Sequence, residues 1–223
     1  MIGNSLLDSA RFKARAFLIG ERIDIRALEA SEQLAVAPAA LTVRQDAFLS
    51  GRIAAELLSH FPGPAAVMIG KRQSADSIEK LHGFQTEAAK RGLAIAEVYE
   101  HRDDLKLSNE MTHQLFHEHP EIGGLYVATD NCSGIFRGIE QEGRVGRVRV
   151  VATGVFPEIR DAMDKNLVQF SLDQRMTEQG VLAVKQLHEL LSQRPLPSDR
   201  ILIPPRIAVR GNIELLASQA TIT

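Results

Sequence analysis

Between Pro64 and Gln174 the chain alternates short apolar segments with longer segments that carry apolar residues at helical spacing. Short apolar runs bounded by turn residues are typical of buried strands, and apolar residues three and four apart are typical of helices with one buried face. The expected strands are AAVMIG, AIAEVYE, GGLYVATD, VRVVATG and LVQFSLD. The expected helices are SIEKLHGFQTEAAKRG, LSNEMTHQLFHEH, SGIFRGIEQEG and PEIRDAMDKN. This alternation predicts an α/β fold with a mainly parallel sheet and helices on both faces, because parallel neighbours need crossover connections.

Polar loops with the sequences TDN, TGVF and LDQ follow three of these strands. In open parallel sheets, ligands bind outside the carboxyl ends of the strands. The pattern therefore indicates a receptor for a small molecule. With 223 residues, the chain is long enough to bury a substantial core and to divide into two lobes.

On either side of this region the pattern is less regular. Before residue 63 it predicts a strand in ARAFLI, a helix in RALEASEQLA, a strand in APAALTV and a helix in SGRIAAELLSHF, which PGP ends. After residue 174 it predicts a helix in MTEQGVLAVKQLHELLSQ and a closing strand in RILIPPRIAVRGNI, which the double proline interrupts. We therefore expect a first lobe of residues 1–62 and 175–202, and a second lobe of residues 63–174 and 203–223.

Charge and cysteine content narrow the class of protein. The 26 basic and 28 acidic residues give a net charge of -2, so the chain has no basic excess of the kind that binds nucleic acid. The single cysteine, Cys132, rules out an internal disulfide framework and is typical of a reducing compartment. No apolar run is long enough for a bilayer, and the amino end lacks the apolar core of a secretory signal. These features predict a cytoplasmic protein without membrane contact.

The motifs of common enzyme classes are absent. The chain has no phosphate-binding loop, no dinucleotide-binding G-x-G-x-x-G and no G-x-S-x-G nucleophile elbow. His113 and His117 have the helical spacing at which two imidazoles can share a metal, but no H-E-x-x-H motif or third ligand accompanies them. We expect surface histidines there, and a small, partly buried thiol at Cys132. The sequence thus predicts a protein that is not an enzyme and has no cofactor or metal.

From Leu41 onward, six segments resemble, in order, the ligand-binding core of the lactose-repressor (LacI/GalR) family of bacterial transcription regulators. TVRQDAFLSGRIAAELL is similar to the family's V-x-x-D-x-x-x-x-G-x-x-A-x-x-L segment, and IEKLHGFQTEAAKRG to its R-x-x-G-F helix, with lysine in place of arginine. HPEIGGLYVATDNCSGIFRGIEQEG and VRVVATGVFPEI follow its next two strand–helix units. LVQFSLDQRMTEQGVLAVKQLHELL resembles its Q-x-x-x-x-x-G-x-x-A return segment, and PPRIAVRGN its terminal P-x-x-L/I-x-x-R-x-S/N.

The resemblance implies a two-lobed, type I periplasmic-binding-protein-like fold whose first lobe is shorter than is usual in the family. It implies the effector-sensing core of a regulator, which binds a sugar or related polar metabolite between two lobes and signals to a DNA-binding headpiece. No headpiece is recognisable in this sequence, so we expect no direct DNA contact by this chain. We expect a homodimer, because a short first lobe leaves apolar faces of LLSHF and VLAVKQLHELL uncovered. Two alternatives stay open: a solute-binding protein of a sugar transport system, and an enzyme on a flavodoxin-like sheet.

The resemblance also points to individual ligand-binding residues. Gln174 matches a glutamine at the crossing back to the first lobe. Asp130 and Asn131 stand where the family carries an asparagine–aspartate pair, although a turn or cap role also suits them. Lys80 takes the place of an arginine that forks across ligand hydroxyls, and lysine offers a point charge instead. We expect Lys80 to favour an anionic ligand, unless it is a solvated helix lysine.

Two further candidate residues carry an open alternative. Asp46 matches a ligand-contacting aspartate of the first lobe, and it is equally suited to cap the helix that follows. Phe156 offers a stacking face for a ligand, or it is a core aromatic beneath its loop. Gly154 stands where the family commonly has a ligand-holding aspartate, which argues against the usual family sugar.

Overall fold

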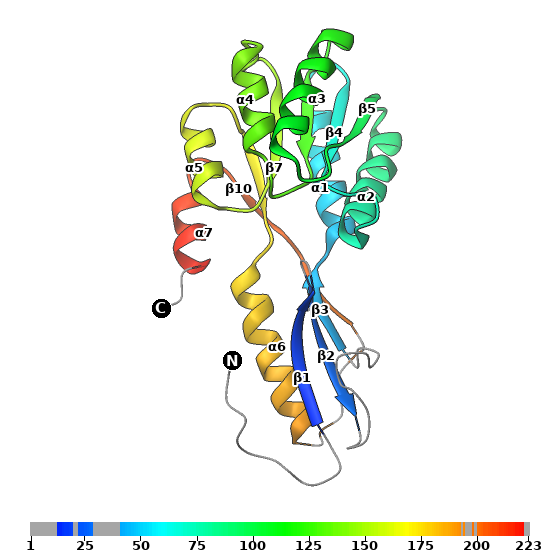
Figure 1. The fold of residues 1–223 in the computed structure, drawn as a ribbon. Helices are drawn as coiled ribbons and strands as arrows, with labels where there is room; N and C mark the ends of the chain where they lie inside the picture. The colour runs from blue at the N-terminus through cyan, green and yellow to red at the C-terminus, as the bar shows by residue number, and fades with distance from the viewer. Residues whose placement is uncertain are drawn as a thin grey trace. The chain divides into compact units, whose positions relative to one another are not determined.

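Two groups of elements, each with a sheet of its own, make up the computed structural model of the protein (Figure 1). The structure describes residues 13–19, 22–28, 41–192, 194, 198 and 200–220. Unit 1 contains the described residues of 1–45 and 175–203, and unit 2 contains those of 46–174 and 204–223. This division differs from the one expected at residue 62, because the helix that follows Gln45 packs within unit 2.

Unit 2 is built on a six-stranded sheet in the order β10-β8-β7-β6-β4-β5. Neighbouring strands run parallel, except that β10 pairs antiparallel with β8. The strands are β4 (Ala65–Ile69), β5 (Ile95–Glu100), β6 (Gly124–Val127), β7 (Arg149–Thr153), β8 (Phe170–Asp173) and β10 (Arg206–Ala208). All the strands expected between Pro64 and Gln174 are present, and the predicted mainly parallel sheet is confirmed.

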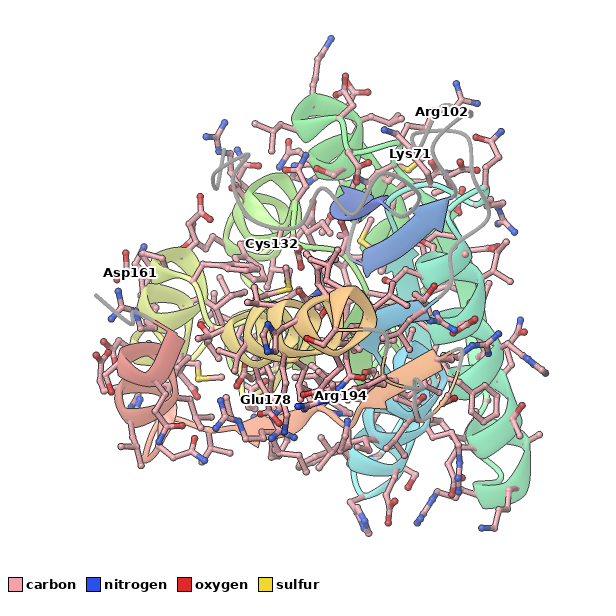
Figure 2. All side chains as sticks on the ribbon, turned by 90° about the horizontal axis from the view of Figure 1, so that it is seen from below. Lys71, Arg102, Cys132, Asp161, Glu178 and Arg194 are labelled. Atoms are coloured by element: carbon pink, nitrogen blue, oxygen red, sulfur yellow. The ribbon has the colours of Figure 1, made fainter. Side chains whose placement is uncertain are left out.

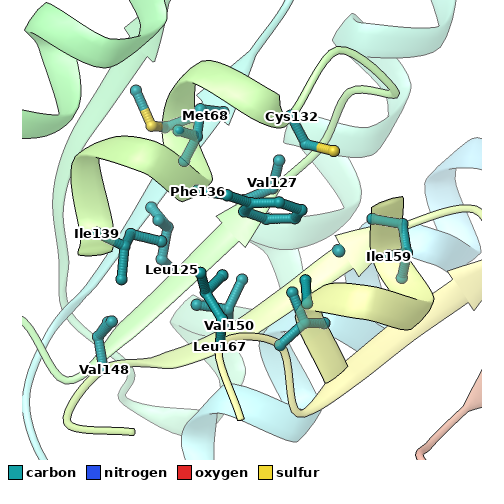
Figure 3. Close-up of a cluster of buried hydrophobic side chains, with 14 of the residues drawn as sticks. Met68, Leu125, Val127, Cys132, Phe136, Ile139, Val148, Val150, Ile159 and Leu167 are labelled. Carbon is teal, nitrogen blue, oxygen red and sulfur yellow. The ribbon is translucent and has the colours of Figure 1, made fainter. Parts of the chain in front are cut away.

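Helices cover both faces of this sheet (Figure 1). They are α1 (Ala47–Ser59), α2 (Ala75–Arg91), α3 (Leu105–Glu118), α4 (Ser133–Gln141), α5 (Pro157–Asp164) and α7 (Ile213–Ala220). Successive residues of a strand point to opposite faces. Accordingly, Val67 of β4 packs in the core under α1 and α2, while Met68 packs in the core under α3, α4, α5 and α7. Figure 3 shows part of this second core, where Phe136 of α4 lies close to Val127 of β6.

Unit 1 has a four-stranded sheet in the order β1-β2-β3-β9. Its strands are β1 (Lys13–Ile19), β2 (Arg22–Leu28), β3 (Leu41–Gln45) and β9 (Arg200–Ile203). The first three pair antiparallel, whereas β9 runs parallel to β3. Helix α6 (Met176–Leu191) packs on this sheet, with Ala183 against Leu41, Val43 and Ile203.

The helix expected in RALEASEQLA is wrong where the structure describes that segment. Its first three residues complete β2, and the others lie outside the described residues. In RIDIRAL the apolar Ile23, Ile25 and Ala27 alternate with charged residues, which is the period of a strand and not of a helix.

The closing strand expected in RILIPPRIAVRGNI is in fact two strands. β9 ends at Ile203 in unit 1, and β10 begins at Arg206 in unit 2. Pro204 and Pro205 lie between them, and neither proline can donate a backbone hydrogen bond to a sheet. The double proline therefore marks the point at which the chain leaves one sheet for the other.

Candidate functional site

The position of Lys80 on α2 is set by a close contact between two helices. α1 and α2 cross at Gly51 and Gly83, the glycines of the two matched motifs. A Cβ on Gly51 would stand 1.9 Å from the carbonyl oxygen of Lys80, and one on Gly83 would stand 2.0 Å from that of Phe48. Because only glycine permits this approach, these two residues fix where Lys80 lies in unit 2.

The side chain of Lys80 is fully buried and its charge is paired. Its Nζ lies 2.5 Å from Oδ2 of Asp76, one turn earlier on the same helix. An unpaired ammonium is strongly disfavoured away from water, so Asp76 accounts for the burial of Lys80. Lys80 is therefore not a solvated lysine, and its charge is compensated by a carboxylate of the chain itself.

Asp130 and Gln174 come together at the carboxyl ends of parallel strands. Asp130 comes after β6 and Gln174 directly follows β8, and these two strands flank β7. The Nε2 atom of Gln174 donates a hydrogen bond of 3.1 Å to Oδ1 of Asp130. Gln174 is buried, whereas Asp130 is open to solvent on one side. The structure thus joins two of the predicted residues into a carboxylate–amide pair.

Further charged groups surround Asp130. Removal of water by the neighbouring protein is the main cause that raises the pKa of Asp130 above its ordinary value. The ammonium of Lys80 and the amide of Gln174 lower the pKa, whereas the carboxylates of Asp76 and Asp103 raise it. These groups come from α2, from the loop after β5 and from the segments that follow β6 and β8. We call Asp76, Lys80, Asp103, Asp130 and Gln174 the strand-end site.

Asn131 holds the loop that carries Asp103. Its Nδ2 donates to the backbone oxygen of Asp103 at 2.5 Å. The Asp103 carboxylate accepts a 3.4 Å hydrogen bond from the Thr129 hydroxyl and lies 3.3 Å from Nζ of Lys71. Figure 2 shows Lys71 and Arg102, the residue before Asp103, at the same edge of unit 2. Asn131 therefore supports the site through its hydrogen bond to this loop.

His101, at the start of the same loop, was not singled out by the sequence. Its side chain is fully buried, and neither ring nitrogen has a hydrogen-bond partner among the described residues. Burial lowers the pKa of His101, so its ring is neutral near pH 7. Arg102 and Asp103 have φ angles of 56° and 60°, a region that residues other than glycine rarely adopt. The sequence signal for this loop is weak, because neither position holds glycine and only Asp103 is of a residue type enriched in this region.

Asp46 and Phe156 make the local contacts that were the alternatives for them. Oδ1 of Asp46 accepts a 2.9 Å hydrogen bond from the backbone N–H of Leu49, so Asp46 caps α1. The ring of Phe156 packs against the core, with its tip 2.1 Å from the place that a Cβ on Gly154 would take. Gly154 also has a φ of 89°. An aspartate at position 154 would therefore need both a strained backbone and the space that Phe156 fills.

A separate concave surface of unit 2 is apolar. This cavity of about 360 Å³ is lined by Ile69, Arg72, Ser77, Ile78, Leu81, His82 and Gln85. No three His, Cys, Asp or Glu side chains of the described residues gather as a metal ion would require. None of the helices in the described part of the chain is long and apolar enough to cross a bilayer. At the carboxyl ends of the parallel strands, the polar groups that the fold brings together are those of the strand-end site.

Solved structures of the same fold include several sugar-binding proteins. The chain is similar to a glucose-galactose binding protein from Geobacillus stearothermophilus, with 17% identity and a TM-score of 0.73 over 81% of this chain and 66% of that one. It is similar to a periplasmic ribose ABC transporter from Conexibacter woesei DSM 14684, with 21% identity and a TM-score of 0.74 over 84% of this chain and 64% of that one. It is also similar to an ABC transporter solute binding protein from Agrobacterium vitis bound with alpha-D-tagatopyranose, with 23% identity and a TM-score of 0.73 over 81% of this chain and 62% of that one. The chain thus spans less than two thirds of the length of these structures.

No curated protein matches the chain in sequence. The periplasmic binding protein domain family matches residues 31–195, which is more than half of the 223 residues. The parallel sheet of unit 2, with helices on both faces, agrees with the type I fold of such proteins. The chain therefore belongs to the periplasmic binding protein domain family.

Proposed function

We propose that this chain binds a small polyhydroxylated molecule of the sugar type at the strand-end site and releases it unchanged. The observation that carries this proposal is the 3.1 Å hydrogen bond between Gln174 and Asp130 at the carboxyl ends of parallel strands. A carboxylate accepts hydrogen bonds from hydroxyl groups, and an amide both donates and accepts, so the pair suits a molecule with several hydroxyls. Solved structures of the same fold support a sugar, since they include a glucose-galactose binding protein, a periplasmic ribose ABC transporter and a solute binding protein bound with alpha-D-tagatopyranose.

Binding without chemical turnover is part of the proposal. Nucleophilic catalysis needs an activated nucleophile within reach of an oriented base. Burial raises the pKa of the Cys132 thiol to about 12, so this thiol is not a nucleophile near neutral pH. His101 is fully buried and lacks a partner, among the described residues, that could orient it as a base. These features favour a binding protein over the enzyme alternative.

Two biological roles suit such a binding domain. Our first proposal is a solute-binding protein of a sugar transport system, because the similar solved structures include ABC transporter proteins. The second is the effector-sensing core of a LacI-type regulator, which the six matched segments support. The second role would require a cytoplasmic location and a homodimer, for which the exposed Val181 and Val184 of α6 offer apolar surface.

Isothermal titration calorimetry with glucose, galactose, ribose and tagatose tests the proposed binding. Gln174→Ala should weaken the binding of any sugar that the parent binds by about 1–3 kcal/mol, because a buried hydrogen-bond partner is lost. Gln114→Ala, on the exposed surface of α3, serves as the matched control and should bind like the parent. The proposal fails if no such sugar binds the parent, or if Gln174→Ala binds as tightly as the parent does.

Deletion of the gene in its host separates the two roles. A transport role predicts that uptake of the bound sugar, followed with a radiolabel, is lost. A regulatory role predicts instead that transcription of the genes for its use changes when the sugar is supplied. Cell fractionation adds a second readout, since a transport receptor would be exported and a regulator retained in the cytoplasm.

A further inference from the structure

We propose that the ligand of the strand-end site carries a protonated amine, and that Asp130 is the group that recognises it. This inference rests on the proposed function and narrows the ligand class from neutral sugars to amino sugars. It is argued from the charge balance at the site and from the acceptor positions of Asp130 that remain open.

Two of the three carboxylates at the site are paired with an ammonium group. Asp76 lies 2.5 Å from Nζ of Lys80, and Asp103 lies 3.3 Å from Nζ of Lys71. Asp130 has no ion-pair partner among the described residues, and its side chain accepts from the neutral amide of Gln174. Three carboxylates therefore face two ammonium groups, and the uncompensated negative charge lies on Asp130.

The carboxylate of Asp130 has room for further donors. An ionised carboxylate offers about four acceptor positions, and Gln174 occupies one of them on Oδ1. Asp130 is exposed, so a ligand can approach the others from solvent. An ammonium group supplies three N–H donors, and its charge-assisted bonds are about twice as strong as those of a neutral hydroxyl. The burial of the Lys80 side chain against Asp76 reduces the repulsion that such a ligand would otherwise meet.

The electrostatic surroundings of Asp130 also favour the binding of a cation. Removal of water, together with the carboxylates of Asp76 and Asp103, raises the pKa of Asp130 and so disfavours its ionised form. A bound cation favours the ionised form. By linkage, binding of the cation lowers this pKa, and its affinity increases as the pH rises through the pKa of Asp130. A neutral sugar gains far less from the ionisation of Asp130.

Matched pairs of sugars test the inference by calorimetry. D-Glucosamine is compared with D-glucose, and D-galactosamine with D-galactose, at about pH 6, where the amines are charged. N-Acetylglucosamine keeps the nitrogen but removes the charge. We expect at least one amino sugar to bind at least about tenfold more tightly than both its neutral counterpart and the acetylated sugar. Asp130→Asn should abolish this preference, whereas Asp161→Asn, at an exposed carboxylate on α5, should leave it intact.

The outcomes distinguish this inference from the proposed function. If neutral sugars bind as tightly as amino sugars, the inference is overturned and the proposed function stands. If the preference survives in Asp130→Asn, Asp130 is not the recognising group and the inference is overturned as well. If neither neutral nor amino sugars bind, the proposed function itself fails. Should Asp130→Asn not fold, the parent decides the question, because its preference for the amino sugar must decline as the pH is lowered through the pKa of Asp130.

Discussion

Replacement of Gly51 by alanine tests whether the crossing of α1 and α2 requires glycine. The added methyl group would stand 1.9 Å from the carbonyl oxygen of Lys80 and 2.7 Å from the backbone nitrogen of Phe84. Real Cβ atoms essentially never approach such atoms within 3.0 Å, so the helices must separate by at least 3.0 − 1.9 = 1.1 Å. Both neighbours are backbone atoms, which cannot turn aside as a flexible side chain would.

The expected cost follows from two opposing effects on the free energy of unfolding. Overpacking of a core contact costs about 3 kcal/mol when a whole helix has to shift, the upper part of the usual range. The higher helix propensity of alanine offsets about 1 kcal/mol of this cost. We therefore expect Gly51→Ala to lower the stability of unit 2 by about 2 kcal/mol.

Urea unfolding followed by circular dichroism measures this difference, with Gly180→Ala as a matched helix control. Outside the neighbouring backbone of α6, no heavy atom of the described residues lies within 4 Å of the place that a Cβ on Gly180 would take, so alanine there should stabilise α6 by about 0.5–1 kcal/mol. Because the Lys80 carbonyl lies in the contact, Gly51→Ala should also weaken sugar binding at the strand-end site. An unfolding midpoint for Gly51→Ala at or above that of the parent would refute the reasoning.

Three further expectations concern unit 2. The hydrogen bond with Glu142 raises the pKa of His113, so the stability that protonated His113 contributes should be lost as the pH rises through that pKa. His113→Gln should therefore flatten the dependence of the melting temperature on pH above about pH 6.5, and an unchanged profile would contradict this. Burial raises the pKa of the Cys132 thiol to about 12, so iodoacetamide should leave Cys132 unmodified until urea unfolds the protein. Mass spectrometry measures this modification, and rapid labelling of the native protein would contradict the expectation. Arg206→Ala removes hydrogen bonds of 3.0 and 2.7 Å to the buried carboxylate of Asp173. In chemical denaturation it should lower the free energy of unfolding by about 2 kcal/mol, which is less than the loss of a partner costs in a fully buried ion pair. An unchanged free energy of unfolding would show that this pair does not stabilise unit 2.

The sheet of unit 2 could be predicted because its strands are buried on both faces. Such strands read as short, continuous apolar runs, as all five residues of β4 do, and the helices between them keep a clear apolar face. The same pattern placed Asp130 and Gln174 at strand ends, and the structure joins them by a hydrogen bond. The rule that ligands bind at the carboxyl ends of parallel strands pointed to the loops TDN and LDQ, and the family resemblance singled out Asp130 and Gln174 within them.

Other parts of the site depend on features that no local pattern contains. Asp103 reaches the strand-end site through a loop in which it and Arg102 adopt positive φ angles. Aspartate is enriched in this conformation but arginine is not, so two such residues in succession could not be foreseen. Asp76 carries a weak signal, since it stands one helical turn before Lys80, a spacing that allows an ion pair. The motif glycines, Gly51 and Gly83, were recognisable by resemblance. The reason why glycine is required at these positions appears only when α1 and α2 pack together.

The separation of β9 and β10 by Pro204 and Pro205 has a consequence for synthesis of the protein. β9 completes the pairing of β3 in one sheet, and β10 completes that of β8 in the other, so both sheets receive their last described strand between residues 200 and 208. The ribosome delivers this short stretch after every other described strand, and until then β3 and β8 each present an open edge. A stop codon shortly before residue 200 would therefore leave both units incomplete at once. In a protein whose domains follow one another along the chain, the same truncation would spare all but the last domain.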